Sequence, residues 1–155
     1  MSQSELVKEA VEESGARRQD LLPVLQYIVN KESFLSPRRV EEVAEAMDLS
    51  AAQVYGVASF YSFLSTEKLG KNIIRICKTI TCYMKGKDRI IKAIENELNI
   101  KLGETTPDGE FSFLPTNCIG WCHKGPAMLI NDRVYTEVTP QEAVQAIKEH
   151  REGKE

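Results

Sequence analysis

The chain has 155 residues, enough for one or two small domains with a modest hydrophobic core. Hydrophobic residues make up 42% and charged residues 28% of the sequence, as in ordinary soluble globular proteins. The formal net charge of -3 gives no basic footprint for nucleic acid, and no apolar run is long enough to span a bilayer. We therefore expect no nucleic-acid partner and no direct membrane insertion. Since the N-terminus lacks the basic and apolar regions of an export signal, we also expect a cytoplasmic protein.

Residues 1–65 have the pattern of four helices and no strand. Apolar residues recur at helical spacing in the first two helices: Leu6, Val7, Ala10 and Val11, then Leu21, Leu22, Leu25, Ile28 and Val29. Asp20 is the expected N-cap of the second helix, and Ser36-Pro37 is a start signal for the third. In the third helix we expect an inward face of Val40, Val43, Ala44 and Met47 and an outward face of Arg38, Arg39, Glu41, Glu42 and Glu45.

A fourth helix, from Ala51 to Leu64, is predicted by the capping box that Ser50 forms with Gln53. Its apolar residues lie on most sides of the helix: Val54, Tyr55, Val57, Ala58, Phe60, Tyr61 and Phe63. We favour a core helix of a four-helix unit. The same pattern also fits a helix that is buried against both domains or against a partner.

The pattern changes to alternating strands and helices after a polar hinge at 67–71. The predicted elements are strands at 72–77, 110–114, 127–130 and 133–135, a helix after Gly86 with Ile90, Ile94 and Leu98 on one face, and a helix from Pro140 to about His150 capped by Thr139. We expect the first two strands to lie parallel and adjacent, as a right-handed βαβ unit with the helix between them requires. The loops that follow these two strands should therefore emerge at the same edge of the sheet.

The only four cysteines form two closely spaced pairs, Cys77 with Cys82 and Cys118 with Cys122, and each pair follows one of these two strands. Four thiolates from two loops are a complete ligand set for a [2Fe–2S] cluster, with two thiolates per iron. A zinc ion bound by four thiolates is an alternative that these spacings tolerate, and disulfides are another that would need an oxidising compartment. We favour the cluster, because an iron–sulfur rhomb is wider than one zinc ion and suits looser spacings.

Three segments resemble a known family: Cys77-Lys-Thr-Ile-Thr-Cys82-Tyr-Met-Lys-Gly86, Cys118-Ile-Gly120-Trp-Cys122-His-Lys-Gly-Pro126 and Val54-Tyr-Gly-Val-Ala-Ser-Phe-Tyr61. The sequence is similar to thioredoxin-like [2Fe–2S] subunits such as the 24-kDa subunit of respiratory complex I and the small subunit of NAD(P)-linked, electron-bifurcating [FeFe]-hydrogenases. One departure is Gly125, which stands where alanine is common in the family.

The resemblance implies an α+β fold, in which an N-terminal helical bundle at 1–66 precedes a thioredoxin-like α/β domain with a mixed sheet at 71–152. It implies an electron-transfer subunit with one [2Fe–2S] cluster, bound through Cys77 and Cys82 on one iron and Cys118 and Cys122 on the other. The expected partners are a flavoprotein subunit that carries FMN and the NAD(P) site, and a further iron–sulfur catalytic subunit.

The short chain favours the subunit of a soluble hydrogenase, with respiratory complex I or an NAD-linked formate dehydrogenase as alternatives and a zinc-stabilised adaptor as a distant one. The sequence has no G-x-G-x-x-G or Walker A motif and no nucleophile–base constellation. We therefore expect a subunit of an oxidoreductase complex that does not turn over by itself and contains no catalytic residue.

Lysines lie in or beside both cysteine loops: Lys78, Lys85, Lys87 and Lys124. Their charge either offsets the anionic cluster and favours its reduced form, or belongs to an ordinary solvated surface. We expect the amides of Gly86 and Gly120 to donate hydrogen bonds to sulfur. His123 is expected at the surface or next to the ligands, without being one.

Overall fold

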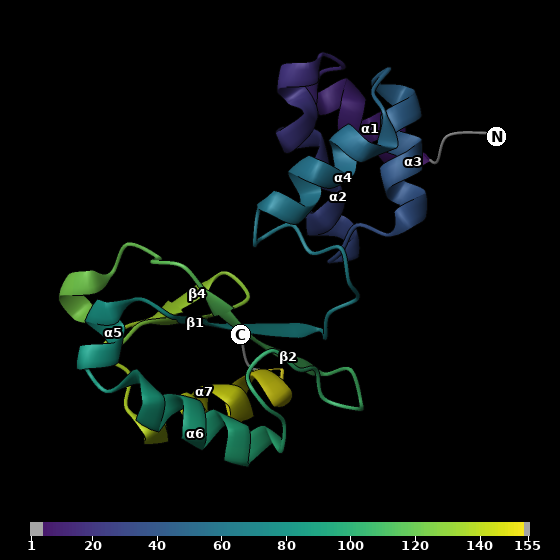
Figure 1. The fold of residues 1–155 in the computed structure, drawn as a ribbon. Coiled ribbons are helices and arrows are strands. Elements are labelled where there is room, and N and C mark those ends of the chain that lie inside the picture. Colours follow the sequence, from purple (N-terminus) through teal and green to yellow (C-terminus); the bar gives the residue numbers. More distant parts are fainter. Residues whose placement is uncertain (1–4, 154–155) are drawn as a thin grey trace. The chain divides into compact units, whose positions relative to one another are not determined.

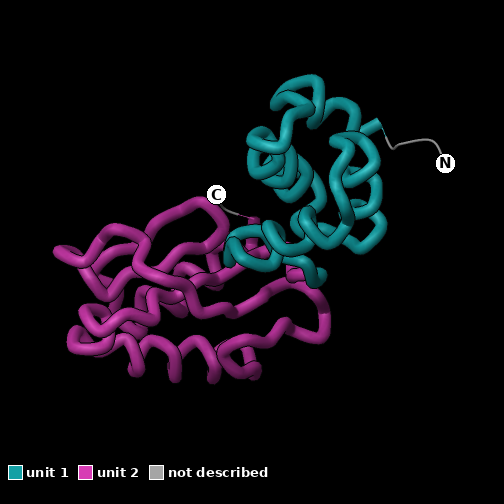
Figure 2. Tube along the Cα trace, turned by 45° about the horizontal axis from the view of Figure 1, so that its top comes forward, with its two compact units in different colours: residues 1–68 teal, residues 69–155 magenta. Residues whose placement is uncertain are grey.

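Residues 5–153 are described by a computed structural model, which Figure 1 shows as a ribbon. The chain divides into two units, residues 1–68 and residues 69–155, which are coloured separately in Figure 2. We call them unit 1 and unit 2. The sequence-based domain limits, 1–66 and 71–152, stay a prediction.

Unit 1 is built from helices. They are α1 (Glu5–Ser14), the 3₁₀-helix η1 (Arg18–Asp20), α2 (Leu21–Glu32), α3 (Pro37–Ala46) and α4 (Ala51–Phe60). Local capping sets the start of two of them, as the sequence predicts. Ser36 Oγ accepts a hydrogen bond from the Arg39 amide at 3.3 Å. Ser50 Oγ accepts one from the Gln53 amide at 3.2 Å, and Gln53 Oε1 accepts one from the Ser50 amide at 3.0 Å.

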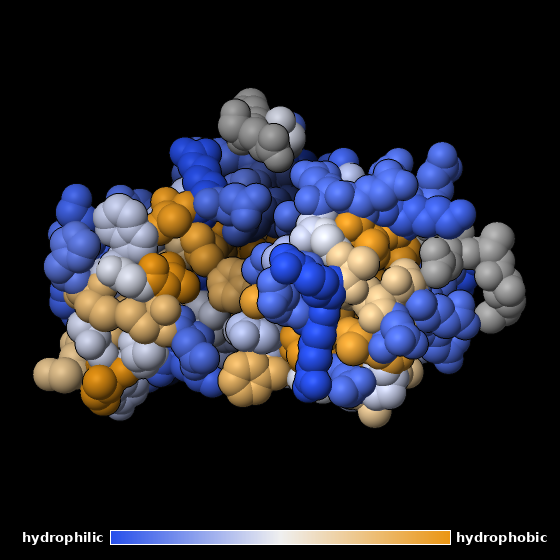
Figure 3. Space-filling model, turned by 90° about the horizontal axis from the view of Figure 1, so that it is seen from above, coloured by the Kyte–Doolittle hydropathy of each residue, from blue (hydrophilic) through white to orange (hydrophobic). Residues whose placement is uncertain are grey.

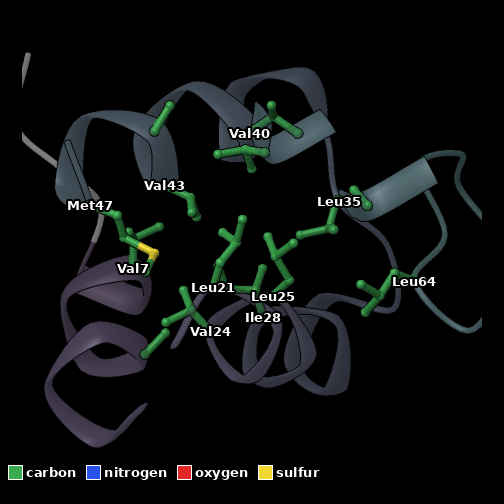
Figure 4. Close-up of a cluster of buried hydrophobic side chains, with 14 residues drawn as sticks. Val7, Leu21, Val24, Leu25, Ile28, Leu35, Val40, Val43, Met47 and Leu64 are labelled. Carbon is green, nitrogen blue, oxygen red and sulfur yellow. The ribbon is translucent and has the colours of Figure 1, made fainter. Parts of the chain in front are cut away.

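The buried side chains of unit 1 come from every one of its α-helices and point toward one another, as Figure 4 shows for Val7, Leu25 and Val43 among others. The core continues beyond the helices through Leu35 and Leu64, which lie in the connections after α2 and α4. The predicted inward face of α3 is therefore confirmed. It supplies Val40, Val43, Ala44 and Met47 to the core.

Three predictions about unit 1 are wrong in detail. Asp20 occupies the N-cap position of α2 as predicted, but its side chain does not cap that helix; it accepts a hydrogen bond from the Arg17 amide at 3.1 Å and so closes η1. The fourth helix ends at Phe60 rather than Leu64, because Tyr61 has extended backbone angles. Glu42 does not face solvent; only 8% of it is exposed, and Arg38 and Arg39 both bind its carboxylate.

Unit 2 is a sheet with helices packed on it. Its elements are β1 (Asn72–Cys77), α5 (Ile80–Met84), α6 (Lys87–Leu98), β2 (Phe111–Thr116), the 3₁₀-helix η2 (Cys122–Lys124), β3 (Met128–Ile130), β4 (Arg133–Tyr135) and α7 (Pro140–Arg151). The strand order is β2-β1-β3-β4. Because β1 is parallel to β2 and antiparallel to β3, the sheet is mixed, and the predicted fold class is confirmed.

The helices α6 and α7 lie side by side on one face of the sheet (Figure 1). Their buried residues Ile90, Ile94 and Ile147 pack with Phe111 and Phe113 of β2 in the core. Gly86 has a φ of 88° immediately before α6, a left-handed conformation that favours glycine and turns the chain from α5 into α6. Two short helices, α5 and η2, stand where the sequence predicts only loops. Among the described residues, no helix is long and apolar enough to cross a membrane.

Candidate functional site

The four cysteines lie at one edge of the sheet in unit 2. Cys77 is the last residue of β1 and pairs in register with Thr116, the last residue of the parallel strand β2. Cys82 lies within α5, which follows β1, whereas Cys118 and Cys122 lie in the loop after β2 and in η2. The predicted meeting of the two loops therefore follows from the parallel βαβ unit.

The two cysteine pairs differ in burial. Cys77 and Cys82 are 1% and 2% exposed, whereas Cys118 is exposed and Cys122 is half-buried. All four are free thiols rather than disulfides. One pair is thus held inside the protein, and the other faces the surface.

Hydrogen bonds surround the sulfurs. Cys77 Sγ lies 3.0 Å from Thr79 Oγ1, and Cys118 Sγ accepts a bond from the Gly120 amide at 3.4 Å. The Sγ atoms of Cys118 and Cys122 are 3.1 Å apart. Within residues 5–153, no three His, Cys, Asp or Glu side chains are arranged to hold a single metal ion.

The pKa shifts of the thiols show that the two pairs influence each other. Burial raises the pKa of the Cys82 thiol, and the neighbouring sulfurs of Cys77 and Cys118 raise it further. The pKa of Cys122 is raised first by its hydrogen bond with Cys118 and also by the charges of Cys82 and Cys77. At Cys77, burial acts to raise the pKa, but hydrogen bonds from Thr79, Cys82 and the Ile119 backbone prevail and lower it.

This donor set fits a [2Fe–2S] cluster. Four thiolates in two pairs match the requirement of two sulfur ligands per iron. The pKa of Cys82 is raised mainly by burial and that of Cys122 mainly by its hydrogen bond with Cys118, with the neighbouring sulfurs adding to both, and two bound iron ions would favour the thiolate forms. The amide of Gly120 and the hydroxyl of Thr79 supply hydrogen bonds to sulfur of the kind that tunes such centres.

The basic side chains predicted near the site take up different positions. Lys78 and Lys124 are exposed, and Lys87 Nζ donates to the carbonyl oxygen of Lys78 at 3.1 Å. Lys85 reaches across to backbone carbonyls of the second cysteine loop. His123 is exposed, and its ring stacks on that of Trp121 with centroids 5.7 Å apart.

One predicted interaction is wrong, and two residues near the sulfurs are absent from the sequence-based prediction. The Gly86 amide donates to the carbonyl of Tyr83 at 3.0 Å rather than to sulfur, because Gly86 closes the last turn of α5. Thr79 is a hydrogen-bond partner of Cys77. Its position two residues after the cysteine could have predicted this contact from the sequence, because Ser and Thr hydroxyls often bond to groups nearby in the chain. Gly125, in sequence only a departure from the family, lies against Cys82 and Lys85.

Comparison with known proteins gives a consistent result. Residues 7–151 match the family described as thioredoxin-like [2Fe-2S] ferredoxin. The chain is 39% identical to an NADH-quinone oxidoreductase subunit of Buchnera aphidicola subsp. Acyrthosiphon pisum over 120 residues. The matched region covers 77% of this chain and 74% of that protein. It is 34% identical over 131 residues to NADH-quinone oxidoreductase subunit 2 of Thermus thermophilus, covering 84% of this chain and 72% of that protein.

A solved structure shares the fold. A chain of an NAD+-reducing [NiFe]-hydrogenase superposes with a TM-score of 0.75 at 22% identity, over 86% of this chain and 23% of that chain. The family match specifies a [2Fe–2S] cluster, in agreement with the cofactor predicted from the cysteine pairs. Because the match spans nearly all described residues, the chain belongs to the thioredoxin-like [2Fe-2S] ferredoxin family.

Proposed function

We propose that the chain is an electron-transfer subunit whose cluster is held by Cys77 and Cys82 on one iron and by Cys118 and Cys122 on the other. The observation that carries this proposal is the convergence of four free thiols, from two loops, at one edge of a sheet. A [2Fe–2S] cluster supplies one-electron chemistry when bound. We assign to this chain the task of holding and tuning that centre.

Different residues of the chain hold the cluster and tune it. Cys77 and Cys82 are buried, so their side of the site is closed to water, which favours cluster retention. The Gly120 amide donates a hydrogen bond to Cys118 Sγ, and the Thr79 hydroxyl is the only possible donor in its hydrogen bond with a Cys77 thiolate. Such bonds draw negative charge from sulfur and favour the reduced form.

The subunit belongs, in this proposal, to an NAD(P)H-linked flavoprotein oxidoreductase complex. Its relatives are named as subunits of NADH-quinone oxidoreductases, and a chain of its fold occurs in an NAD+-reducing hydrogenase. Because a one-electron centre cannot accept a hydride directly, FMN and the NAD(P) site are assigned to a flavoprotein partner. A further iron–sulfur catalytic subunit would complete the path of the electrons.

The finer proposal is a soluble NAD(P)-linked hydrogenase in the cytoplasm. The fold shared with the NAD+-reducing hydrogenase is compatible with it. The names of the sequence relatives favour the alternative, a quinone-reducing complex of the complex I type. An NAD-linked formate dehydrogenase is the third possibility. Affinity purification of the tagged chain from its native cells, followed by mass spectrometry, distinguishes the three by the catalytic subunit that accompanies it.

The cluster is tested on the chain purified under anaerobic conditions. We expect about two iron and two sulfide per chain. Stoichiometric zinc without sulfide would contradict the proposal. The relay is tested by reduction: dithionite should bleach the isolated chain, NADH should not, and NADH should do so once the flavoprotein subunit is added. Catalytic reduction of the isolated chain by NADH would exclude a pure relay.

A further inference from the structure

Lys85 connects the two cysteine loops. It follows α5 directly, three residues after Cys82, and so belongs to the first loop. Its Nζ donates hydrogen bonds to the carbonyl oxygens of Cys122, at 3.1 Å, and His123, at 3.3 Å. These acceptors lie 37 and 38 positions further along the chain, in the second loop. The ammonium group thus joins the turn that carries one buried cysteine to the turn that carries one partly exposed cysteine.

Gly125 makes room for the aliphatic stem of Lys85. A Cβ atom at position 125 would lie 3.3 Å from Lys85 Cδ and 3.4 Å from Cys82 Sγ. The contact with Lys85 Cδ is tighter than most Cβ contacts in proteins, whereas the contact with Cys82 Sγ is an ordinary van der Waals contact. The φ of Gly125 is -77°, a value that any residue adopts, so the backbone conformation does not require glycine here. Because Gly125 has no side chain, Lys85 and Cys82 can pack closely against its backbone.

The neighbouring lysine provides a comparison. Lys87 Nζ also donates to a backbone carbonyl, that of Lys78 at 3.1 Å, but both residues belong to the first half of the site. Lys87 therefore holds its own loop, whereas Lys85 ties that loop to the other. The two side chains carry the same charge and lie two positions apart in sequence.

We propose that Lys85 is a positioning residue that fixes the Cys118–Cys122 loop relative to Cys82 and so maintains the spacing of the four thiolates around the cluster. This proposal rests on the proposed function, because it concerns the same ligand set. Hydrogen bonds from a charged donor are stronger than neutral ones, and two of them converge on adjacent carbonyls of the more exposed loop. Without them, that loop can move away and open the cluster to solvent.

The test compares Lys85→Met, Lys85→Arg and Lys87→Met in the full chain with its cluster. Methionine keeps the stem and removes the ammonium group, whereas arginine keeps charge and donors. Cluster release to an iron chelator is followed by visible absorbance. We expect release from Lys85→Met to be about tenfold faster than from the wild type, with release from Lys85→Arg and Lys87→Met close to the wild type. Since Lys85→Met and Lys87→Met each remove one positive charge, their difference reports the bridge rather than the charge.

A second variant and two further readouts separate positioning from folding. Gly125→Ala pushes the Lys85 stem and should also accelerate release, by less than Lys85→Met. Visible circular dichroism of the bound cluster should change in both variants. The thermal unfolding of the cluster-free Lys85→Met chain should not change, because the Lys85 ammonium lies at the surface.

Three results would overturn the assignment. Release from Lys85→Met no faster than from Lys87→Met, with a cluster present in the wild type, removes the role of Lys85 and leaves the proposed function intact. Equal acceleration in the methionine and arginine variants excludes the hydrogen bonds as its basis. A wild-type chain that binds no cluster would overturn both the role of Lys85 and the proposed function.

Discussion

The two units differ in what completes their structure. Unit 1 has a hydrophobic core to which all its α-helices contribute. It also contains a cluster of charged side chains in which Arg39 binds both Glu32 and Glu42. Unit 2 has a core of its own, but its sheet edge ends in two cysteine loops whose thiols crowd one another. The described core of unit 1 is formed by its own side chains, whereas the edge of unit 2 brings together four thiols that we propose to bind the cluster. Changes at the cysteines should therefore affect unit 2 alone.

Both units also expose large apolar side chains, at different kinds of position. In unit 1 these are aromatic residues in and after α4: Tyr55, Phe60, Tyr61 and Phe63. In unit 2 the most exposed ones belong to the first cysteine loop, where Ile80 is 67% and Met84 is 80% exposed. Hydrophobic atoms are visible in Figure 3 at the end of unit 2 that carries α5 (left in Figures 1 and 3). Exposed patches of this kind are typical of interaction surfaces.

The largest effect is expected from removing a buried ligand. Cys82 is 2% exposed and packs against Gly125, so serine at this position leaves a poor ligand in a site that cannot adjust. Cys118 is exposed, and its loop has room to bring a serine or water oxygen to iron. We expect Cys82→Ser to lose most of its iron during purification and Cys118→Ser to keep most of it with a shifted visible spectrum.

Iron and sulfide assays on the wild type and both variants measure this difference. Far-UV circular dichroism of the same samples checks that the helices of unit 1 remain. Equal retention in the two serine variants would show that burial does not distinguish the two loops. A loss of helix signal in Cys82→Ser greater than α5, α6 and α7 of unit 2 can account for would show that unit 1 depends on the cluster.

The next largest effect should arise in unit 1, from Arg39→Met. The Arg39 guanidinium donates to Glu32 at 2.8 Å and to Glu42 at 2.6 Å, and Glu42 is 8% exposed. Removing the guanidinium leaves a buried carboxylate with only part of its compensation. We expect the free energy of unfolding to fall by about 2 kcal/mol at pH 7, with cluster content unchanged. Denaturant unfolding measures this change in the free energy of unfolding. Arg38→Met is the control: because the Arg38 side chain is 77% exposed, its removal should lower the free energy of unfolding by less than about 1 kcal/mol.

This difference should depend on pH in one direction. The hydrogen bond from Arg39 holds the pKa of Glu32 below its ordinary value of 4.5. A carboxyl group with a lowered folded pKa stabilises the fold above its unfolded pKa and loses that contribution as the pH falls through the folded value. The gap between wild type and Arg39→Met should therefore be full above about pH 5 and shrink below about pH 4.5. A gap that widens on acidification would contradict the assigned partner.

Signals within a few residues are sufficient to predict much of this structure. The capping box of Ser50 with Gln53 and the cap that Thr139 provides for the last helix are confirmed, because in each case the interacting groups lie on the same turn. The parallel pairing of β1 with β2 follows from the handedness of the βαβ unit, and it places both cysteine loops at one edge. Family resemblance then identifies the cofactor.

Features that depend on distant partners could not be predicted. The charged sequence neighbours of Glu42 favour solvent exposure, but Arg39 also binds Glu32 of another helix and makes burial of the group tolerable. The bridge from Lys85 joins residues 37 positions apart and depends on the close approach of Gly125. The end of α4 at Phe60 is not marked by glycine or proline, so the continuous apolar run predicts a helix that is too long.

A smaller effect is expected from the exposed aromatic side chains of unit 1. Phe60 is 80% exposed at the end of α4, so Phe60→Ser should change the stability of the chain by less than about 0.5 kcal/mol. If this surface docks on the flavoprotein, its affinity should fall about tenfold, which corresponds to about 1.4 kcal/mol. Titration of the purified subunits measures this, with Ser59→Ala on the same helix as a control expected to bind normally. Unchanged affinity of Phe60→Ser would assign docking to other surfaces, such as the apolar end of unit 2.

The smallest effect is expected at Lys78, which follows Cys77 directly. The side chain of Lys78 is exposed. The hydrogen bond from Lys87 Nζ is accepted by the backbone carbonyl of Lys78 and does not involve the Lys78 ammonium group. Removing a positive charge near an anionic cluster disfavours the reduced form, so Lys78→Gln should lower the midpoint potential. Water and salt screen an exposed charge, and the shift should therefore stay below about 59 mV, or tenfold in a one-electron equilibrium, and shrink as ionic strength rises. Redox titrations at low and high salt measure it, with the exposed Lys92 of α6 changed to Gln as the control. A larger or salt-independent shift would mean that Lys78 turns toward the sulfurs when the cluster is bound, and a rise in potential would contradict the assumed sign of the cluster's charge.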